Sequence, residues 1–243
     1  MPMKFLPIRK RRGFTQMETV IAIGVLALLL TAFLAVFGPA TSGLRKAISV
    51  QEADRLSAAL ERELVTIRPG TSSSQYKTGF DKAYQWIEGA SGGGNESIFL
   101  YQYRGIPDQI RSDGSMEPYV TGGGVAGKDF LVQPAVRKRD DPLFLEDLNA
   151  VEGRIFSAKL TQLEFDQGQL VKREGQGINQ DPNGTGETLG GTGSDAYVEA
   201  VIAFAAEFYI LPNSDPNYVK PGGKFNPKNL DKPVFTRNLA VRR

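Results

Sequence analysis

The sequence predicts an α+β protein in which one long N-terminal helix packs on an antiparallel β-sheet. Three observations support this fold class. A charge-free apolar run extends from Glu18 to Arg45, an amphipathic pattern continues to Arg68, and segments of alternating apolar residues fill the remainder of the chain. A chain of 243 residues accommodates one membrane anchor and one globular domain.

The apolar run has the length of a membrane span. Residues 19–37 alone would extend about 28 Å as an α-helix, which matches the hydrocarbon core of a bilayer. The segment before it contains no acidic residue and five basic ones, Lys4, Arg9, Lys10, Arg11 and Arg12. A basic flank stays in the cytoplasm, so we predict a single-pass protein whose C-terminal domain lies across the membrane.

The junction between the basic segment and the apolar run is distinctive. Gly13 and Phe14 are followed by Glu18, and a carboxylate at the edge of an apolar helix usually faces a partner. In these features the N-terminus resembles the type IV prepilins and the type II secretion pseudopilins. The resemblance covers roughly the first quarter of the chain, and Gln16 and Met17 stand where the family usually carries aliphatic residues.

The resemblance implies processing followed by assembly. In that family a prepilin peptidase of the inner membrane cleaves after the glycine, here Gly13, and methylates the new amino terminus, here Phe14. The resemblance also implies that Glu18 then pairs with the amine of a neighbouring subunit's Phe14. Other pilin or pseudopilin subunits are therefore the expected partners, in a filament held by the N-terminal helices. The mature length favours a minor component, and the lack of cysteine mildly favours a pseudopilin.

Two other interpretations of the N-terminus stay open. A secretory signal peptide would be cleaved near Ala40, where Gly38 and Pro39 precede a possible site. Against this, the apolar run is longer than a typical signal core and Glu18 interrupts its start. The second alternative is an uncleaved signal anchor. The residue at which the mature chain begins distinguishes the three.

The sequence predicts four segments. These are a basic leader peptide (1–13), a transmembrane and assembly helix (14–38), an amphipathic helix (39–68) and a β-rich domain (69–243). Gly38 and Pro39 are expected to disturb the helix, because proline lacks an amide donor, and Pro69-Gly70 to end it. The stripe that the second helix buries comprises Leu44, Ile48, Leu56, Leu60, Leu64 and Ile67.

The domain that follows has the pattern of a sheet. Predicted strands cover 84–88, 97–103, 129–136, 154–165, 169–173, 196–211 and 234–241, with a helical turn at 142–148. Residues 154–165 and 169–173 are expected to form a hairpin, and Pro134 places its strand at an edge. Glycine-rich segments at 89–95, 122–127 and 175–193 are predicted loops, the last of them mobile.

Composition excludes several kinds of chemistry. The chain has no histidine and no cysteine, so Ser-His-Asp and Cys-His catalysis and histidine or thiolate metal sites are absent. Without the leader's five cations, 24 basic residues face 27 acidic ones, which leaves residues 14–243 at −3. We therefore expect no nucleic-acid partner, although Arg137, Lys138 and Arg139 offer a local basic patch.

Two loops carry motif-like patterns. Asp181, Asn183, Thr185 and Glu187 place oxygen atoms at alternate positions around Gly186, as at the start of a calcium loop. The terminal acidic ligand of such a loop is missing, because Thr192 occupies its position, and this favours the alternative of a flexible loop without metal. The resemblance favours calcium, because some pseudopilins hold calcium in a loop of the C-terminal domain. The segment 122–128 resembles part of a phosphate-binding loop, but Asp129 replaces the required hydroxyl, which favours a plain loop.

Three other functions are alternatives to a filament subunit. One is a signal-anchored extracytoplasmic binding module that recognises a ligand through glycine-rich loops and exposed Trp86, Tyr101 and Tyr103. Another is a DNA-uptake minor pilin. A membrane-anchored enzyme would have to use the carboxylates of Asp140, Asp141, Glu146 and Asp147, a cluster more typical of a solvated surface. We expect a structural protein and no enzyme.

Overall fold

The structure of the chain is a computed structural model that describes residues 15–68, 75–92, 94–175 and 177–243. It divides into two compact units, Met1–Ile48 and Ser49–Arg243, which are treated separately below. The predicted leader, the cleavage and methylation residues Gly13 and Phe14, and the helix-ending Pro69-Gly70 lie outside the described residues.

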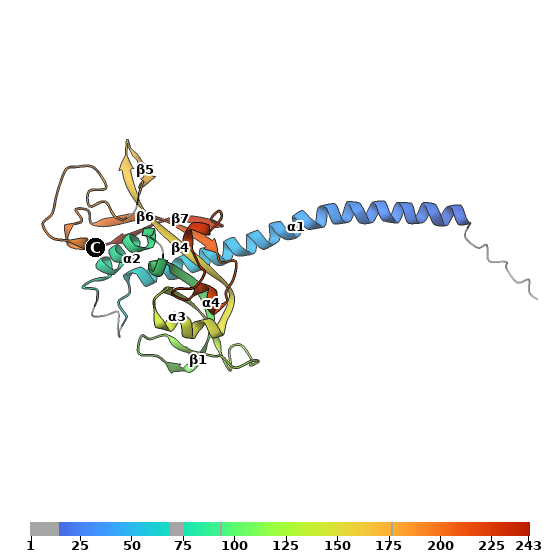
Figure 1. Cartoon of the computed structure of the whole chain (residues 1–243), viewed down its shortest axis with the longest axis horizontal. Helices are drawn as coiled ribbons and strands as arrows, with labels where there is room; N and C mark the ends of the chain where they lie inside the picture. The colour runs from blue at the N-terminus through green and yellow to red at the C-terminus, as the bar shows by residue number, and fades with distance from the viewer. Residues whose placement is uncertain (1–14, 69–74, 93, 176) are drawn as a thin grey trace, which may run out of the picture. The chain divides into compact units, whose positions relative to one another are not determined.

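One helix, α1 (Gln16–Val65), supplies the described part of the first unit and the beginning of the second (Figure 1). It is not interrupted at Gly38-Pro39, where the sequence predicted a disturbance. After the proline, the hydroxyls of Thr41 and Ser42 donate to the Gly38 carbonyl oxygen at 2.9 and 2.8 Å, which satisfies a backbone acceptor in this turn.

The second unit continues with a seven-stranded antiparallel sheet and shorter helices. Its elements are α2 (Gly79–Gly92), β1 (Ile98–Ile110), β2 (Met116–Pro118), β3 (Leu131–Lys138), α3 (Pro142–Asp147), β4 (Val151–Asp166), β5 (Gln169–Lys172), β6 (Val201–Ile210), α4 (Pro216–Val219) and β7 (Phe235–Arg242). The main strand order is β2-β1-β4-β6-β7, with β3 paired to β1 and β5 to β4. The predicted α+β class is confirmed.

Strand pairing fixes the position of each element. β3 runs antiparallel to β1 from Ile98↔Lys138 to Gly105↔Leu131, and β4 and β5 form the predicted hairpin. Among the described strands, β3 pairs only with β1, so Pro134 lies in an edge strand as expected. β7 pairs only with β6 and forms an edge on the other side.

The predicted strand at 84–88 is wrong, because these residues belong to α2. Buried Phe80, Tyr84 and Ile87 recur at helical spacing, and the Thr78 hydroxyl caps the helix by accepting from the Asp81 amide at 3.1 Å. A Cβ on Gly79 would lie 2.4 Å from the Val65 carbonyl oxygen, so only glycine lets α2 start this close to the end of α1.

Other boundaries also differ from the predictions. β1 extends to Ile110 rather than ending at 103, and β3 lies two residues later than expected. Residues 196–200 are not part of β6, because a 3₁₀ turn (Gly193–Ala196) precedes it. β2 and α4 were not predicted. Both are too short to produce a recognisable hydrophobic period.

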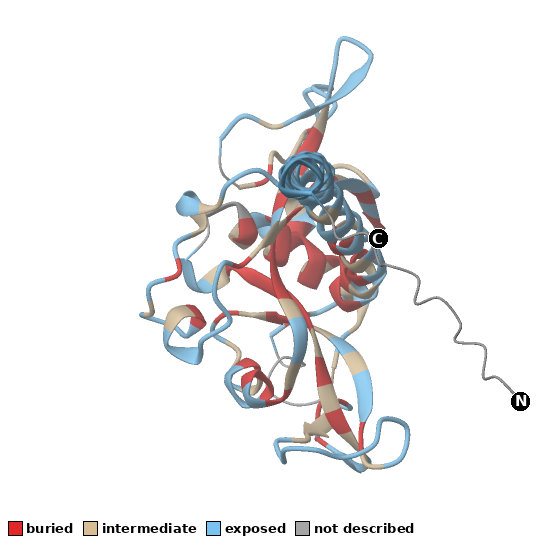
Figure 2. Ribbon diagram, turned by 90° about the vertical axis from the view of Figure 1, so that its right-hand side faces the viewer, coloured by how far each residue is buried: buried red, intermediate tan, exposed pale blue. Residues whose placement is uncertain are grey.

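Two hydrophobic clusters fill the second unit (Figure 2). The larger lies between one face of the sheet and the helices α1 and α2, where Leu56, Leu60 and Leu64 are fully buried. The other members of the predicted buried stripe are exposed, so the prediction is wrong for Leu44, Ile48 and Ile67. The smaller lies on the opposite face beside α3 and α4 and includes Phe144 and Phe225. β1 contributes to both clusters, because successive side chains of a strand point to opposite faces.

Truncating a leucine of this core should destabilise the second unit. Leu60→Ala removes fully buried methyl groups and should lower the free energy of unfolding by about 2–5 kcal/mol. Leu34→Ala is the matched control, because Leu34 is 60% exposed on the same helix. Denaturation in detergent, followed through the fluorescence of Trp86, the single tryptophan, measures both. Equal midpoints for the two variants would contradict the assigned core.

Candidate functional site

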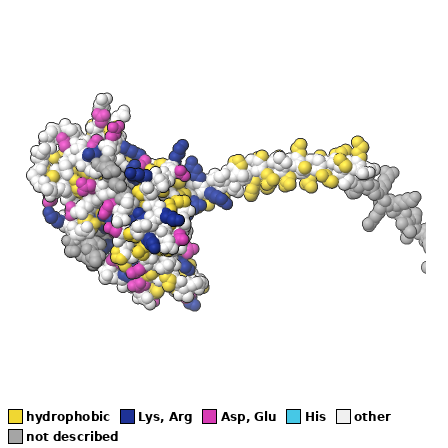
Figure 3. Space-filling view, in the orientation of Figure 1, with side chains coloured by type: hydrophobic (Ala, Val, Ile, Leu, Met, Phe, Trp, Pro, Cys, Tyr) yellow, Lys and Arg dark blue, Asp and Glu magenta, His cyan; other side chains and the backbone are white. Residues whose placement is uncertain are grey.

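The first half of α1 is the main candidate site. Its large apolar side chains from Met17 to Phe37 are all more than half exposed, and the helix is apolar and long enough to cross a membrane. Figure 3 shows hydrophobic side chains along this segment. An uninterrupted apolar surface of this extent requires lipid or other apolar helices around it. The segment is consistent with a single-pass membrane anchor.

Glu18 closes the start of this helix. The Thr15 amide donates to Glu18 Oε2 at 3.0 Å, and the Glu18 amide donates to Thr15 Oγ1 at 3.2 Å. The Thr15 hydroxyl also donates to Glu18 Oε2, at 3.1 Å. This reciprocal arrangement is a capping box, in which two unpaired amides of the helix start are satisfied.

The capping box was missed at the sequence level, although its signal is present. Thr15-Gln16-Met17-Glu18 has the pattern of a hydroxyl residue followed by glutamate three positions later, directly before an apolar run. The carboxylate of Glu18 therefore has partners within its own chain. Its predicted pairing with the amine of Phe14 stays a prediction, because Phe14 lies outside the described residues.

A second polar site fixes the other end of α1. The Lys82 ammonium donates to Glu63 Oε1 and to the carbonyl oxygens of Glu63 and Thr66, each at 2.7 Å. Lys82 and Glu63 are almost fully buried. Arg68 adds hydrogen bonds from Nε and Nη2 to Glu63 Oε2 at 2.9 and 2.7 Å. A cation here satisfies terminal carbonyl groups and complements the helix dipole.

A buried ion-pair network lies on the opposite face of the sheet. Asp147 is fully buried and accepts from the Tyr101 hydroxyl at 2.6 Å, Arg111 Nη1 at 2.7 Å and Arg137 Nε at 2.9 Å. Burial and the neighbouring charge of Asp147 raise the pKa of Tyr101 well above its usual value. Tyr101 therefore stays a neutral hydrogen-bond donor.

Arg137 links this network to the turn after β1. Its Nη1 contacts Asp113 at 3.1 Å and Asp141 at 3.2 Å, and its Nη2 donates to Ser115 Oγ at 3.0 Å. Burial alone would raise the pKa of Asp113, but hydrogen bonds from Ser115 and the charge of Arg137 together lower it. The predicted solvated acidic face is thus wrong for Asp147, which forms the buried centre of the network.

Two further expectations are corrected by burial. Trp86, Tyr101 and Tyr103 are core residues and present no exposed aromatic surface to a ligand. Arg137 and Arg139 are also buried, and Arg139 donates to the Val219 and Lys220 carbonyl oxygens at 2.8 and 2.7 Å. The proposed basic patch is therefore not available to nucleic acid.

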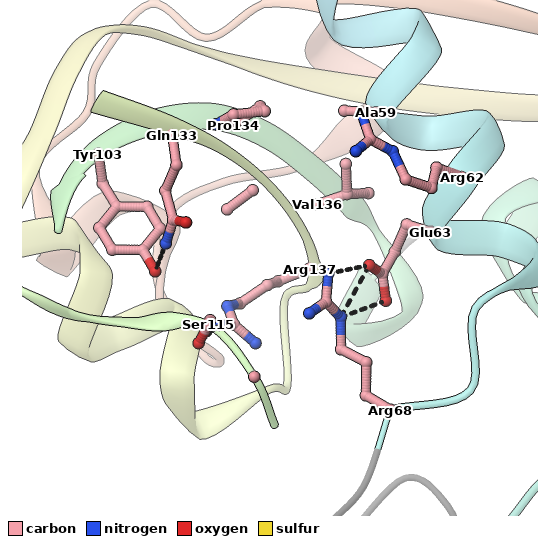
Figure 4. Close-up of a pocket in the computed structure, with 12 residues that line it drawn as sticks. Ala59, Arg62, Glu63, Arg68, Tyr103, Ser115, Gln133, Pro134, Val136 and Arg137 are labelled. Atoms are coloured by element: carbon pink, nitrogen blue, oxygen red, sulfur yellow. Dashed lines mark hydrogen bonds and ion pairs between the residues drawn. The ribbon is translucent and has the colours of Figure 1, made fainter. Parts of the chain in front are cut away.

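A cavity of about 250 Å³ opens beside the network (Figure 4). Ala59, Arg62 and Glu63 line it from the end of α1, Arg68 from the segment after that helix, and residues 133–137 from β3; Tyr103, Gly114 and Ser115 complete it. Arg62 is exposed and its guanidinium has no hydrogen-bond or ion-pair partner among the described residues, whereas the guanidinium groups of Arg68 and Arg137 are paired. The cavity has no local sequence signal, because its walls come from segments that lie far apart in the chain.

Of the candidate calcium residues, Asp181 and Thr185 are in contact, because the Thr185 hydroxyl donates to Asp181 Oδ1 at 3.1 Å. Asp181 accepts from the backbone amides of Thr185 and Gly186 at 3.0 and 2.7 Å. The side-chain amide of Asn183 donates through Nδ2 to Glu199 Oε1 at 2.6 Å. Glu187 is exposed. Within the described parts of the chain, no three acidic side chains cluster as metal ligands. Calcium binding through Asp181, Asn183, Thr185 and Glu187 stays an untested prediction.

The glycine-rich segment 122–128 forms hydrogen bonds with the residues that directly follow it. Asp129 Oδ2 accepts from the Val125 amide at 2.8 Å, and the Gly127 amide donates to the Phe130 carbonyl oxygen at 2.9 Å. The Asp129 carboxylate thus engages the loop in which phosphate would have to bind. This geometry agrees with the predicted plain loop.

Comparisons with known proteins give no match: no family model, no curated protein and no solved structure resembles the chain detectably. A long apolar N-terminal helix on an antiparallel sheet is compatible with a pilin-like fold. The assignment to pilins or pseudopilins therefore depends on the N-terminal motif and the exposed helix.

Stability should fall in acid because of Asp113. Its lowered pKa in the folded chain stabilises the fold above the ordinary carboxyl pKa near 3.9, and this contribution is lost as pH falls through the folded value. Asp113→Asn should unfold more readily at pH 7 and show a smaller decrease in midpoint between pH 5 and about 2. Part of the pH dependence of stability should remain in this variant, because the pKa of Asp81 is also lowered in the folded chain. If the midpoint of Asp113→Asn fell as much between pH 5 and about 2 as that of the unsubstituted chain, the stabilising role of the Asp113 carboxylate would be contradicted.

Proposed function

We propose that this chain is a structural subunit of a type IV pilus-like or type II secretion pseudopilus filament. The observation that supports it most is the exposed apolar segment of α1, with the carboxylate of Glu18 at its start. In this proposal the chain inserts into the inner membrane with its C-terminal domain outside the cytoplasm. A prepilin peptidase then cleaves after Gly13 and methylates Phe14.

Assembly would use the same helix. In a filament the apolar segments of neighbouring copies cover one another, which replaces lipid with protein around each helix. The small residues Gly24 and Ala27 lie in this exposed segment, and small residues allow two helix backbones to approach closely. The role is structural, and no catalysis is proposed.

The carboxylate of Glu18 would supply specificity. In an apolar surrounding a lone charge is costly, and pairing with the amine of a neighbouring Phe14 removes that cost. Cleavage after Gly13 creates this amine one residue before Thr15, whose backbone and hydroxyl already hold Glu18. The capping box thus keeps the carboxylate at the end of the helix where the partner amine arrives.

Two substitutions separate capping from charge pairing. Glu18→Gln keeps an oxygen acceptor for the Thr15 amide, since glutamine also serves in capping boxes, but removes the charge. The Glu18→Gln variant should insert into the membrane normally, but its amount in the sheared filament fraction should fall tenfold or more. This factor corresponds to the loss of about 1.4 kcal/mol or more from a desolvated charge pair. Thr15→Ala weakens the cap and keeps the charge.

The comparison of these variants decides the proposal. Thr15→Ala should remain in the filament fraction, with a helix start weakened by about 1 kcal/mol. Immunoblots of membrane and sheared fractions measure both outcomes. Normal incorporation of Glu18→Gln would show that the charge is dispensable. Loss of incorporation only in Thr15→Ala would assign Glu18 to capping alone.

A further inference from the structure

The cavity beside β3 follows the free edge of that strand. Gln133, Ala135 and Arg137 line it from one face of the sheet, and Pro134 and Val136 from the other. A cavity lined by consecutive residues of a strand lies along its edge, because successive side chains point to opposite faces. The long helix α1 forms the opposite wall with Ala59 and Arg62, and Arg62 points toward β3 in Figure 4.

The backbone at this edge lacks strand partners. The Arg139 amide donates to the Ser97 carbonyl oxygen at 2.9 Å, so in the same register residues 131, 133, 135 and 137 bond to β1. Residues 132, 134 and 136 therefore direct their backbone groups away from the sheet, where no described strand pairs with them. Pro134 removes one donor, which limits the edge to a short added segment.

A second surface of the same unit has complementary chemistry. Between Arg173 and Lys220 the chain contains seven acidic residues and no basic one. In this stretch Glu187 is exposed and its carboxylate has no hydrogen-bond or ion-pair partner among the described residues, and Leu189 is 46% exposed. Residues 184–189 have no regular structure, and glycines at 186 and 190 flank the part that contains Glu187 and Leu189.

The two surfaces do not meet within one copy. The Phe165 amide bonds to the Pro182 carbonyl oxygen and anchors this loop at the end of β4, whereas Val136 lies in register with Leu100 and Phe156. From Phe156 to Phe165 the strand extends about 30 Å at about 3.3 Å per residue. An Arg62–Glu187 contact would therefore form between copies.

We infer that the segment 187–189 of one copy adds as a short strand to the free edge of β3 in a second copy. In an extended segment Glu187 and Leu189 lie on the same side. Glu187 then pairs with Arg62, and Leu189 packs against Ala59 and Pro134. Main-chain hydrogen bonds to the backbone of Val136 and to the Pro134 carbonyl oxygen, both directed away from β1, supply the affinity, as in other cases of strand addition.

This contact is head-to-tail, because the two surfaces differ, and repeated head-to-tail contacts generate filaments. The inference rests on the proposed filament function and specifies how the globular units join. It requires at least two adjacent copies of the chain. It therefore departs from the expectation of a minor component present once at a tip.

The absence of native cysteine allows a direct test in the full-length chain. When the chain carries both Ala59→Cys and Leu189→Cys, a short bismaleimide should crosslink position 59 of one copy to position 189 of the next. In the assembled fraction this 59–189 product should appear as dimers and larger multiples. Ala59→Cys with Leu170→Cys is the matched control, because Leu170 is similarly exposed at 55% but lies on the β4–β5 hairpin. Equal yields from both pairs, or a product with a different protein, would overturn the inference.

Charge reversal tests the ion pair. Arg62→Glu should reduce the 59–189 product about two- to fivefold, the effect expected for an exposed pair, and adding Glu187→Arg should restore it. Arg55→Glu, an exposed arginine outside the cavity, should leave the yield unchanged. An unchanged yield in Arg62→Glu would contradict the pairing.

The two proposals fail in different ways. If the chain is absent from the sheared filament fraction, the proposed function itself is wrong. If the chain is present there and no 59–189 product forms, assembly through α1 stands and only the strand-addition contact is rejected.

Discussion

The structure depends on one helix that has to satisfy two environments. Residues 17–37 of α1 expose large apolar side chains without a polar face, whereas Leu56, Leu60 and Leu64 of the same helix are fully buried in the domain core. The first segment is stable only in lipid or among similar helices, and the second only against the sheet. The same helix therefore has to be covered by lipid or apolar helices along its first half and by the sheet along its second.

Polar groups hold both ends of this helix. At its start the capping box of Thr15 and Glu18 satisfies two amides, and at its end Lys82 bonds to the carbonyl oxygens of Glu63 and Thr66. The domain is stabilised further by the buried network around Asp147. Because the chain contains no cysteine, packing and these ion pairs stabilise the domain without disulfides.

Long periodic segments were predictable, and polar tertiary contacts were not. The apolar run of α1, the β4–β5 hairpin and the edge position of Pro134 follow from local patterns that the structure confirms. The predicted strand at 84–88 is wrong because aromatic and β-branched residues also occur in helices, and here Phe80, Tyr84 and Ile87 are buried at helical spacing. The partners of Asp147 come from β1, the turn after it and β3. These contacts could not be predicted from the sequence, because no local pattern links residues so far apart in the chain.

The state of the N-terminus tests the central claim most directly. Intact mass and N-terminal peptide mass of the chain, purified from cells that contain an active prepilin peptidase, define the first residue. Our account predicts a mature chain that begins at N-methylated Phe14. A chain that retains Gly13 and the preceding basic segment, or one that begins near Thr41, would contradict it.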